Sequence, residues 1–466
     1  MTPHPVSDPF APQFDWPLAF EAERTLREFI GAFLSRNPFA RRLSARMRDE
    51  TGTDFYEWVD HMTLAPEHSA GLAAVGLEEE RVDAPAGTRV FHHPRAMMPR
   101  VLVREGGSAG GVPGVVALRP ESLADFIGRH GIDAEIRGEF GSGFRRAMIV
   151  PDGGGGLEAV ERLGCRSFVT RDRGPGFAAR VVRARELWRM RRRDFADDAE
   201  GIAHALAIQE RAVECVGADA ACELFFSEER AYWEFRNAAA RIQKRRQDGL
   251  GLGWANHDHH TFRCSRALFA DVIGFFGRLG FQRRERYYAG AEAGWGAQIM
   301  EQPVTGIVVF ADVDLLPGEV AVDFTTQRLP GAGRLGTVGL WCALHGDSFL
   351  QAGMHHLEAR FDFPRLRDQL AGEGIGTMKP FSDFPFLRQA FTEGQRWPVD
   401  RSRAERILRE GLISREQFDA FVNSGAIGSH LENLQRKGGY KGFNQKSVSA
   451  IIAATDPRRM LDPVHA

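Results

Sequence analysis

Residues 256–263 read Asn-His-Asp-His-His-Thr-Phe-Arg, with three imidazoles, one carboxylate and one arginine in a single short stretch. Imidazole is a common protein ligand for zinc, iron, copper and nickel. If the stretch is a β-strand, its alternation places His259, Thr261 and Arg263 on one face and the intervening side chains on the other. A metal ligand and a cation for an anionic substrate would then line the same side of a sheet.

Downstream of this stretch, the pattern predicts two copies of a strand–helix–strands module. Each copy opens with two adjacent histidines, the first being His259 in one copy and His355 in the other. Helical spacing then gives way to alternating strands bounded by glycine and proline. The first module is expected over residues 251–340, and the second, with a C-terminal segment, over residues 341–466. The expected elements are strands at 259–264, 296–301, 306–313 and 355–361, and helices at 268–279 and 364–370.

Upstream of the modules we expect an α+β domain over residues 1–198. Its strand around Asp60 and His61 echoes the opening of the two modules, so this domain can be interpreted as a degenerate module. Residues 199–250 are rich in alanine, glutamate, arginine and lysine at helical spacing, which predicts a helical linker.

Composition narrows the class of protein. A chain of 466 residues is too long for one ordinary core, so two or three domains are expected. The formal net charge of -2 gives no general attraction to nucleic acid or anionic membrane. The five cysteines form no CxxC pair, which argues against a disulfide framework and fits a reducing cytosol. Without a signal peptide or a membrane-spanning apolar run, a soluble cytoplasmic protein is expected.

Three motifs resemble a known family, in that family's order. Residues 256–263 resemble the opening D-H-x-x-F-R of the 2-oxoadipate dioxygenase/decarboxylases, also called hydroxyglutarate synthases. Residues 307–319 (IVVFADVDLLPGE) are similar to the strand that closes the family's first module, and residues 442–452 (GFNQKSVSAII) to its C-terminal segment. The resemblance implies a vicinal-oxygen-chelate-like α+β fold, in which paired βαβββ modules curl around a metal.

The resemblance also implies site residues, because family members bind iron(II) through two histidines and one glutamate. A separate arginine and a Val-Ser pair face the substrate in those enzymes. The matching metal ligands are His259, His355 and Glu432, and the matching substrate-site residues are Arg263, Val448 and Ser449.

Alternatives stay open for two of these ligands. His356 competes with His355, because a slip of one residue exchanges the two faces of a strand. Glu301 and Glu393 compete with Glu432, because this chain lacks the glycine that precedes the glutamate in the family.

The function implied by the resemblance is that of a non-haem iron dioxygenase, which oxidatively decarboxylates a 2-oxo acid to a 2-hydroxy acid. Two imidazoles and a carboxylate leave open positions on iron(II), and an arginine can hold a carboxylate bidentately. The expected partners are therefore a small 2-oxo acid and O2, and a homodimer is left open. The alternatives are an isomerase, lyase or extradiol-type dioxygenase on the same fold, or a ligand-binding protein with a decayed metal site.

Overall fold

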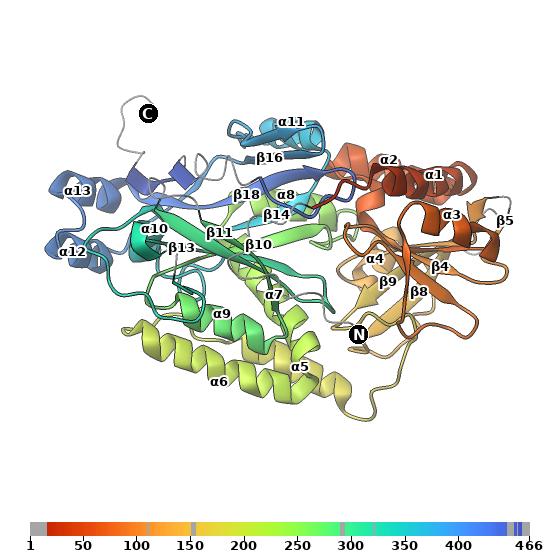
Figure 1. Cartoon of the computed structure of the whole chain (residues 1–466), viewed down its shortest axis with the longest axis horizontal. Helices are drawn as coiled ribbons and strands as arrows, with labels where there is room; N and C mark the ends of the chain where they lie inside the picture. The colour runs from red at the N-terminus through yellow and green to blue at the C-terminus, as the bar shows by residue number, and fades with distance from the viewer. Residues whose placement is uncertain are drawn as a thin grey trace.

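The structure, a computed structural model, contains two large β-sheets that lie side by side in the molecule (Figure 1). It describes residues 16–109, 111–150, 155–288, 294–319, 322–444, 452–453 and 455–458.

The first C-terminal module has the predicted strand–helix–strands order. It runs from β10 (His257–Cys264) through α9 (Phe269–Arg278), β11 (Gln282–Tyr288) and β12 (Trp295–Glu301) to β13 (Val308–Asp314). The chain returns so that β13 lies parallel to β10, with His259 opposite Val308 and Arg263 opposite Asp312. Antiparallel pairing then adds β12 and β11 beyond β13.

The second module repeats this order. It runs from β14 (His356–Arg360) through α11 (Phe363–Gly372), β15 (Ser382–Phe384), β16 (Leu387–Phe391) and β17 (Gln395–Trp397) to β18 (Ala426–Arg436). Between β17 and β18 the chain forms α12 (Arg401–Arg409) and α13 (Arg415–Ser424). β14 is parallel to β18, and it is antiparallel to β10, which joins the two modules. The resulting nine-stranded sheet has the order β11-β12-β13-β10-β14-β18-β16-β15, with β17 paired to β18. This is the paired βαβββ arrangement of the vicinal-oxygen-chelate-like fold.

The N-terminal sheet follows the same plan with fewer strands. Its first unit runs through β1 (Val59–Leu64), α3 (Ser69–Ala74), β2 (Glu78–Glu80), β3 (Arg89–His92) and β4 (Arg100–Val103). Its second unit runs through β7 (Val115–Leu118), α4 (Leu123–His130), β8 (Phe144–Val150) and β9 (Gly156–Arg162). The order is β2-β3-β4-β1-β7-β9-β8, again with two parallel pairs joined by one antiparallel pair. A small hairpin of β5 (Ser108–Ala109) and β6 (Val112–Pro113) lies between the units.

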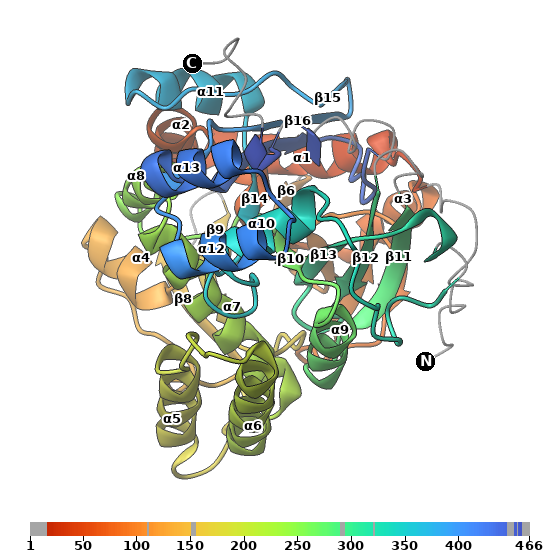
Figure 2. The same cartoon turned by 90° about the vertical axis from the view of Figure 1, so that its left-hand side faces the viewer.

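Further helices cover the sheets, and in Figure 2 α12 and α13 lie in front of α10 (Thr337–His345). Residues 199–250, expected to be a helical linker, contain nearly all of one helix and the whole of two more. The remaining helices are α1 (Phe20–Arg36), α2 (Pro38–Thr51), α5 (Phe177–Arg189), α6 (Asp198–Val216), α7 (Ala218–Phe235) and α8 (Ala238–Asp248), with short 3-10 turns at Phe55–Trp58, Pro66–His68 and Pro317–Glu319. The domain boundaries expected from the sequence stay predictions. No helix in the described ranges combines the length and apolar character needed to cross a bilayer.

The two faces of the nine-stranded sheet differ, as alternation along β10 predicts. On one face, Phe262 and Cys264 pack in a large hydrophobic core with α5, α6, α7 and α9. On the other, which we call the site face, the His259 ring contacts the rings of Phe310 and Phe443. A second hydrophobic cluster lines the site face and includes residues of α10, so this helix covers part of it.

Candidate metal centre

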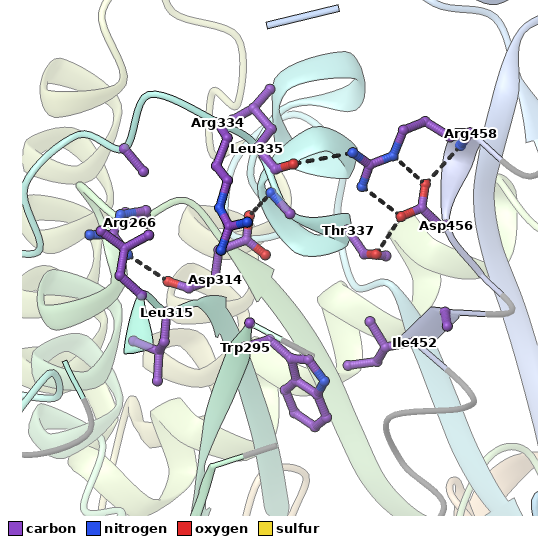
Figure 3. Close-up of a pocket in the computed structure, with 15 residues that line it drawn as sticks. Arg266, Trp295, Asp314, Leu315, Arg334, Leu335, Thr337, Ile452, Asp456 and Arg458 are labelled. Carbon is purple, nitrogen blue, oxygen red and sulfur yellow. Dashed lines mark hydrogen bonds and ion pairs between the residues drawn. The ribbon is translucent and has the colours of Figure 1, made fainter. Parts of the chain in front are cut away.

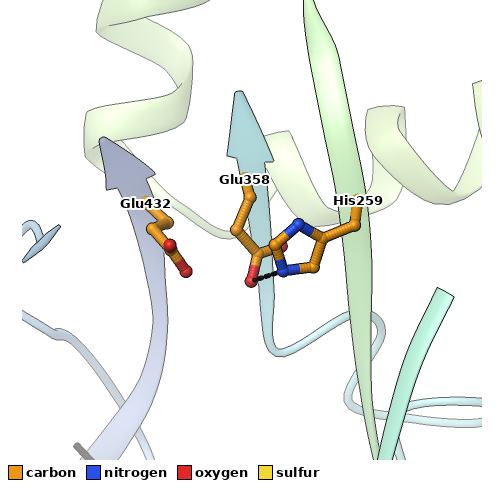
Figure 4. A group of neighbouring side chains, drawn as sticks. All are labelled: His259, Glu358 and Glu432. Atoms are coloured by element: carbon orange, nitrogen blue, oxygen red, sulfur yellow. Dashed lines mark ion pairs between the residues drawn. The ribbon is translucent and has the colours of Figure 1, made fainter. Parts of the chain in front are cut away.

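Three buried side chains on adjacent strands converge on the site face (Figure 4). They are His259 on β10, Glu358 on β14 and Glu432 on β18, and one ligand atom of each lies within 4.8 Å of the others. Their convergence follows from strand register, because Glu358 is directly opposite both His259 and Glu432. The His259 Nε2 atom lies 2.8 Å from Glu358 Oε1.

The His259 ring is oriented by its neighbour in sequence. A β-bulge between His257 and His259 disturbs the alternation, and Asp258 Oδ1 lies 3.0 Å from His259 Nδ1. Arg436 donates from Nε and Nη2 to the two oxygens of Asp258, each at 2.9 Å. Because the carboxylate accepts the Nδ1 proton, Nε2 keeps its lone pair toward the two glutamates. Burial lowers the pKa of His259 to about 4, although Asp258 opposes this shift, so the ring is neutral at pH 7.

The two glutamates form a buried carboxyl pair. Thr261 donates from Oγ1 to Glu358 Oε1 at 3.1 Å, and Gln389 donates from Nε2 to Glu432 Oε1 at 2.8 Å. Burial and the repulsion from Glu432 raise the pKa of Glu358 well above its ordinary value. Burial also raises the pKa of Glu432, to about 8, although its hydrogen bonds oppose the shift. Two such carboxyl groups are costly to ionise together without a nearby cation.

These residues fit a divalent metal ion. Within the described chain no lysine or arginine forms an ion pair with Glu358 or Glu432, whose salt-bridge partners are histidines with lowered pKa values. A divalent cation would therefore supply the charge that the protein does not. One imidazole and two carboxylates are a donor set that suits iron(II) or manganese(II). On the other side of His259, the opposite residue on β13 is Val308, whose side chain offers no ligand atom. An ion held by the three side chains would therefore keep positions for further ligands.

This carboxyl pair predicts a pH dependence of the metal-free protein. The pKa of Glu432 is raised on folding, so its contribution to stability is present below its unfolded value of 4.5 and is lost as pH rises through about 8. We therefore expect Glu432→Gln to gain stability relative to wild type between pH 5 and pH 8. Urea unfolding of both proteins in chelator at several pH values measures this difference, and the titration of the buried histidines cancels in it. A difference that does not change with pH would contradict the assignment.

Arg263 lies on the same face of β10 as His259, further along the strand. Its guanidinium is almost fully buried, with Nε 3.6 Å from Asp312 Oδ2 and Nη2 donating to Thr455 Oγ1 at 3.0 Å. The Trp341 ring of α10 lies 5.8 Å from the guanidinium carbon. Nε and Nη1 of Arg263 donate to no acceptor in the described parts of the chain. Burial raises the pKa of Asp312 to about 7, which weakens this carboxylate as a counter-ion. Arg263 is thus a buried cation with donors available to an anion.

A cavity of about 530 Å³ opens at the end of β13, where Asp314 forms part of its wall (Figure 3). Its wall includes Trp295 and Ile452, which belong to the same hydrophobic cluster as Phe310 and Phe443. The other side chains labelled in Figure 3 include Arg266, Arg334, Asp314, Asp456 and Arg458. The volume is in the range of small-molecule pockets.

His355, the second imidazole ligand expected from the sequence, is not part of the converging group. It precedes β14, where its N–H donates to Thr261 O at 2.9 Å, and its ring packs against Trp341 and His430. The alternative His356 points toward the group, and its Nε2 lies 3.8 Å from Glu432 Oε2 and in contact with Glu358. The strand therefore turns His356 and Glu358 toward the site.

The glutamates proposed as the carboxylate ligand occupy different environments in the structure. Glu432 lies in the converging group, whereas Glu301 forms ion pairs with Lys441 and Arg284 at the end of β12. Glu393 is exposed in a loop. Val448 and Ser449 lie outside the described residues.

Glu358 is the group member that sequence reasoning missed. It stands inside the strand predicted at 355–361, and alternation alone places it on the same face as His356. Alternation alone does not distinguish Glu358 as a ligand from the other side chains on that face. Which residue lies opposite His259 depends on the cross-strand register, which the sequence does not state.

Comparisons with known proteins found distant similarities to solved structures. No family model matches the chain, and no curated protein matches its sequence. Among solved structures, a mutant of 4-hydroxymandelate synthase from Streptomyces coelicolor is similar at 12% identity and a TM-score of 0.28, covering 88% of this chain and 99% of that one. Methylmalonyl-CoA epimerase from Mycobacterium tuberculosis is similar at 12% identity and a TM-score of 0.22, over 39% of this chain and 88% of that one. Glyoxalase I from Zea mays is similar at 14% identity and a TM-score of 0.18, over 24% of this chain and 44% of that one.

Proposed function

We propose that this chain is an iron(II)-dependent oxygenase that converts a 2-oxo acid, with O2, to CO2 and a 2-hydroxy acid one carbon shorter. The reaction is that of the 2-oxoadipate dioxygenase/decarboxylases that the sequence resembles. The observation that carries the proposal is the buried group of His259, Glu358 and Glu432, which shares a sheet face with the available guanidinium of Arg263.

In this proposal the three side chains of the group hold iron(II). Iron(II) held there would supply a Lewis acid for the 2-oxo acid and a centre for O2 chemistry. Two carboxylates balance the charge of the ion, so a further anionic ligand needs a cation nearby. Arg263 supplies that cation and holds the distal carboxylate of a dicarboxylic substrate through two parallel hydrogen bonds.

The remaining side chains of the site face orient the ligands and exclude water. Asp258 fixes the tautomer of His259, and Thr261 fixes the carboxylate of Glu358. The rings of Phe310 and Phe443 beside His259 make the site apolar, which strengthens the hold of Arg263 on an anion.

The test follows the atoms of O2. Protein loaded anaerobically with iron(II) is given a series of 2-oxo dicarboxylic acids and ¹⁸O2. We expect consumption of one O2 for each CO2 released. One labelled oxygen should enter the new carboxylate and the other the new hydroxyl group. Absence of O2 uptake with every acid of the series would reject the oxygenase.

A substitution of Arg263 by lysine separates substrate binding from metal binding. Lysine keeps the charge but loses the planar pair of donors, so we expect KM for the 2-oxo acid to rise by about tenfold or more, with unchanged metal affinity. Steady-state O2 uptake and metal titration measure the two quantities. Arg328→Lys, at an exposed ion pair with Asp271, is the matched control and should change neither. An unchanged KM in Arg263→Lys would remove its proposed role.

A second candidate is a metal-dependent isomerase or lyase on the same fold. It is favoured by the donor set itself, because one imidazole with two carboxylates differs from the two imidazoles and one carboxylate expected for the oxygenase. In such an enzyme one of the two glutamates can leave the metal and act as a base. Turnover of a small acid under strict exclusion of O2 would favour this candidate over the oxygenase.

A further inference from the structure

The N-terminal sheet repeats the surroundings of the metal centre strand by strand. Its strands β4, β1, β7 and β9 pair in the same directions as β13, β10, β14 and β18. A β-bulge disturbs β1 between Val59 and His61, as one disturbs β10 between His257 and His259. His61 therefore takes the position that His259 takes in the other sheet.

The groups that orient the two histidines are also the same. His61 Nδ1 lies 2.7 Å from Asp60 Oδ1, as His259 Nδ1 lies beside Asp258. Arg162, at the end of β9, donates from Nε and Nη2 to both oxygens of Asp60 at 2.7 and 2.8 Å. Arg436, at the end of β18, does the same for Asp258. We call each set of arginine, aspartate and histidine a clasp.

The agreement extends around the arginines. Nη1 of Arg162 donates to two carbonyl oxygens of the loop that follows it, and Nη1 of Arg436 does the same in its own loop. Each loop then supplies a phenylalanine that meets the histidine edge to face, Phe168 at 5.0 Å from His61 and Phe443 at 4.8 Å from His259. Each sheet thus holds the same four residue types, arginine, aspartate, histidine and phenylalanine, in the same arrangement.

The ligand positions differ at one residue. Four residues before each clasp arginine stands a buried glutamate, Glu158 in β9 and Glu432 in β18. Opposite this glutamate, β14 carries Glu358, whereas β7 carries Ala117. Ala117 is also opposite His61, so it occupies the middle position of the three.

The N-terminal sheet supplies a positive charge of its own to Glu158. Arg146 on β8 reaches Glu158, with Nη1 3.4 Å from Oε1. Phe144 and Val160 pack around Ala117 in a small hydrophobic cluster. A buried carboxylate needs a cationic partner, and here an arginine meets that need.

We infer that the N-terminal sheet holds a vacated divalent-metal site, in which His61 and Glu158 remain and Ala117 marks the lost ligand. The inference rests on the proposed metal centre of the C-terminal sheet. A carboxylate returned to position 117, with Arg146 removed from Glu158, completes a one-imidazole, two-carboxylate set for a metal such as cobalt(II).

The experiment counts cobalt(II) bound per chain by equilibrium dialysis, with thermal unfolding as the check on folding. We expect one equivalent in wild type and two in Ala117→Glu/Arg146→Gln. Adding His61→Ala to that variant should return the count to one. Ala117→Gln/Arg146→Gln is the matched control, with an amide in place of the new carboxylate, and should stay at one.

The reciprocal change keeps the inference testable if the rebuilt site does not fold. Glu358→Ala places in the C-terminal sheet the alanine that Ala117 provides at the equivalent position of the N-terminal sheet. We expect this variant to fold but to bind no cobalt. Two outcomes would overturn the inference while leaving the proposed C-terminal centre intact. In the first, the rebuilt variant folds but binds only one equivalent of cobalt. In the second, wild type binds two equivalents and His61→Ala removes one of them. If wild type bound no cobalt, the proposed C-terminal metal centre would be rejected, and this inference would be rejected with it.

Discussion

Replacement of Glu358 by glutamine is expected to raise the dissociation constant for iron(II) or cobalt(II) by more than the roughly 10–100-fold that loss of a supporting partner costs. Glutamine keeps the shape of the side chain, so the strand pairing of Glu358 with His259 and Glu432 is retained. The charge of one ligand is lost, however, and a neutral amide is a weak ligand for these ions. Titration of the metal-free protein followed by calorimetry measures the change.

His355→Gln is the informative companion to this variant. It removes the imidazole that the sequence resemblance favours, while the converging group of His259, Glu358 and Glu432 stays complete. We expect its metal affinity to stay close to that of wild type. The opposite pattern, with metal lost in His355→Gln and kept in Glu358→Gln, would restore the ligand set of the resembled family.

Replacement of Arg436 by methionine is expected to cost about 3–5 kcal/mol of unfolding free energy, the usual price of breaking a buried ion pair. Arg436 makes two buried hydrogen bonds to Asp258 and also donates to two backbone carbonyls. Methionine fills much of the space but leaves the charge of Asp258 without a partner. Chemical denaturation measures the loss, and metal affinity should fall too, because His259 loses its fixed orientation.

Two controls separate charge from packing in this experiment. Asp258→Asn added to Arg436→Met removes the unpaired charge, and we expect it to recover part of the lost stability. Arg162→Met breaks the matching clasp of the N-terminal sheet, so it should lower stability while metal affinity stays unchanged. A loss below about 1 kcal/mol in Arg436→Met would contradict the prediction, because it would mean that the buried pair stabilises the fold no more than a solvent-exposed ion pair does.

The C-terminal fold is predictable from the sequence because its signals are local. Alternation along residues 259–264 places His259 and Arg263 on one face, and the structure agrees. The helices after β10 and β14 are also expected from their spacing. The N-terminal sheet is harder to predict, since β2, β3 and β4 are only three or four residues long and carry little periodicity.

The metal centre is only partly predictable, for a physical reason. His259 and Glu432 carry recognisable surroundings in the sequence, whereas Glu358 becomes a site residue only through its place opposite both of them. Cross-strand register depends on β-bulges, and no residue pattern in the sequence predicts the bulge at Asp258. The cover of α10 over Arg263 is a tertiary contact of the same kind, between residues distant in sequence.

The place of β18 in the sheet has a consequence for folding. It follows every other described strand in sequence, yet it lies between β14 and β16 in space. Until β18 inserts, both of these strands present unpaired edges, which are sites for aggregation. Glu432 arrives on the same strand, so the ligand set is completed only when the sheet is. Metal uptake at the proposed centre would then be a late event that stabilises an almost complete fold, and it would not template early folding steps.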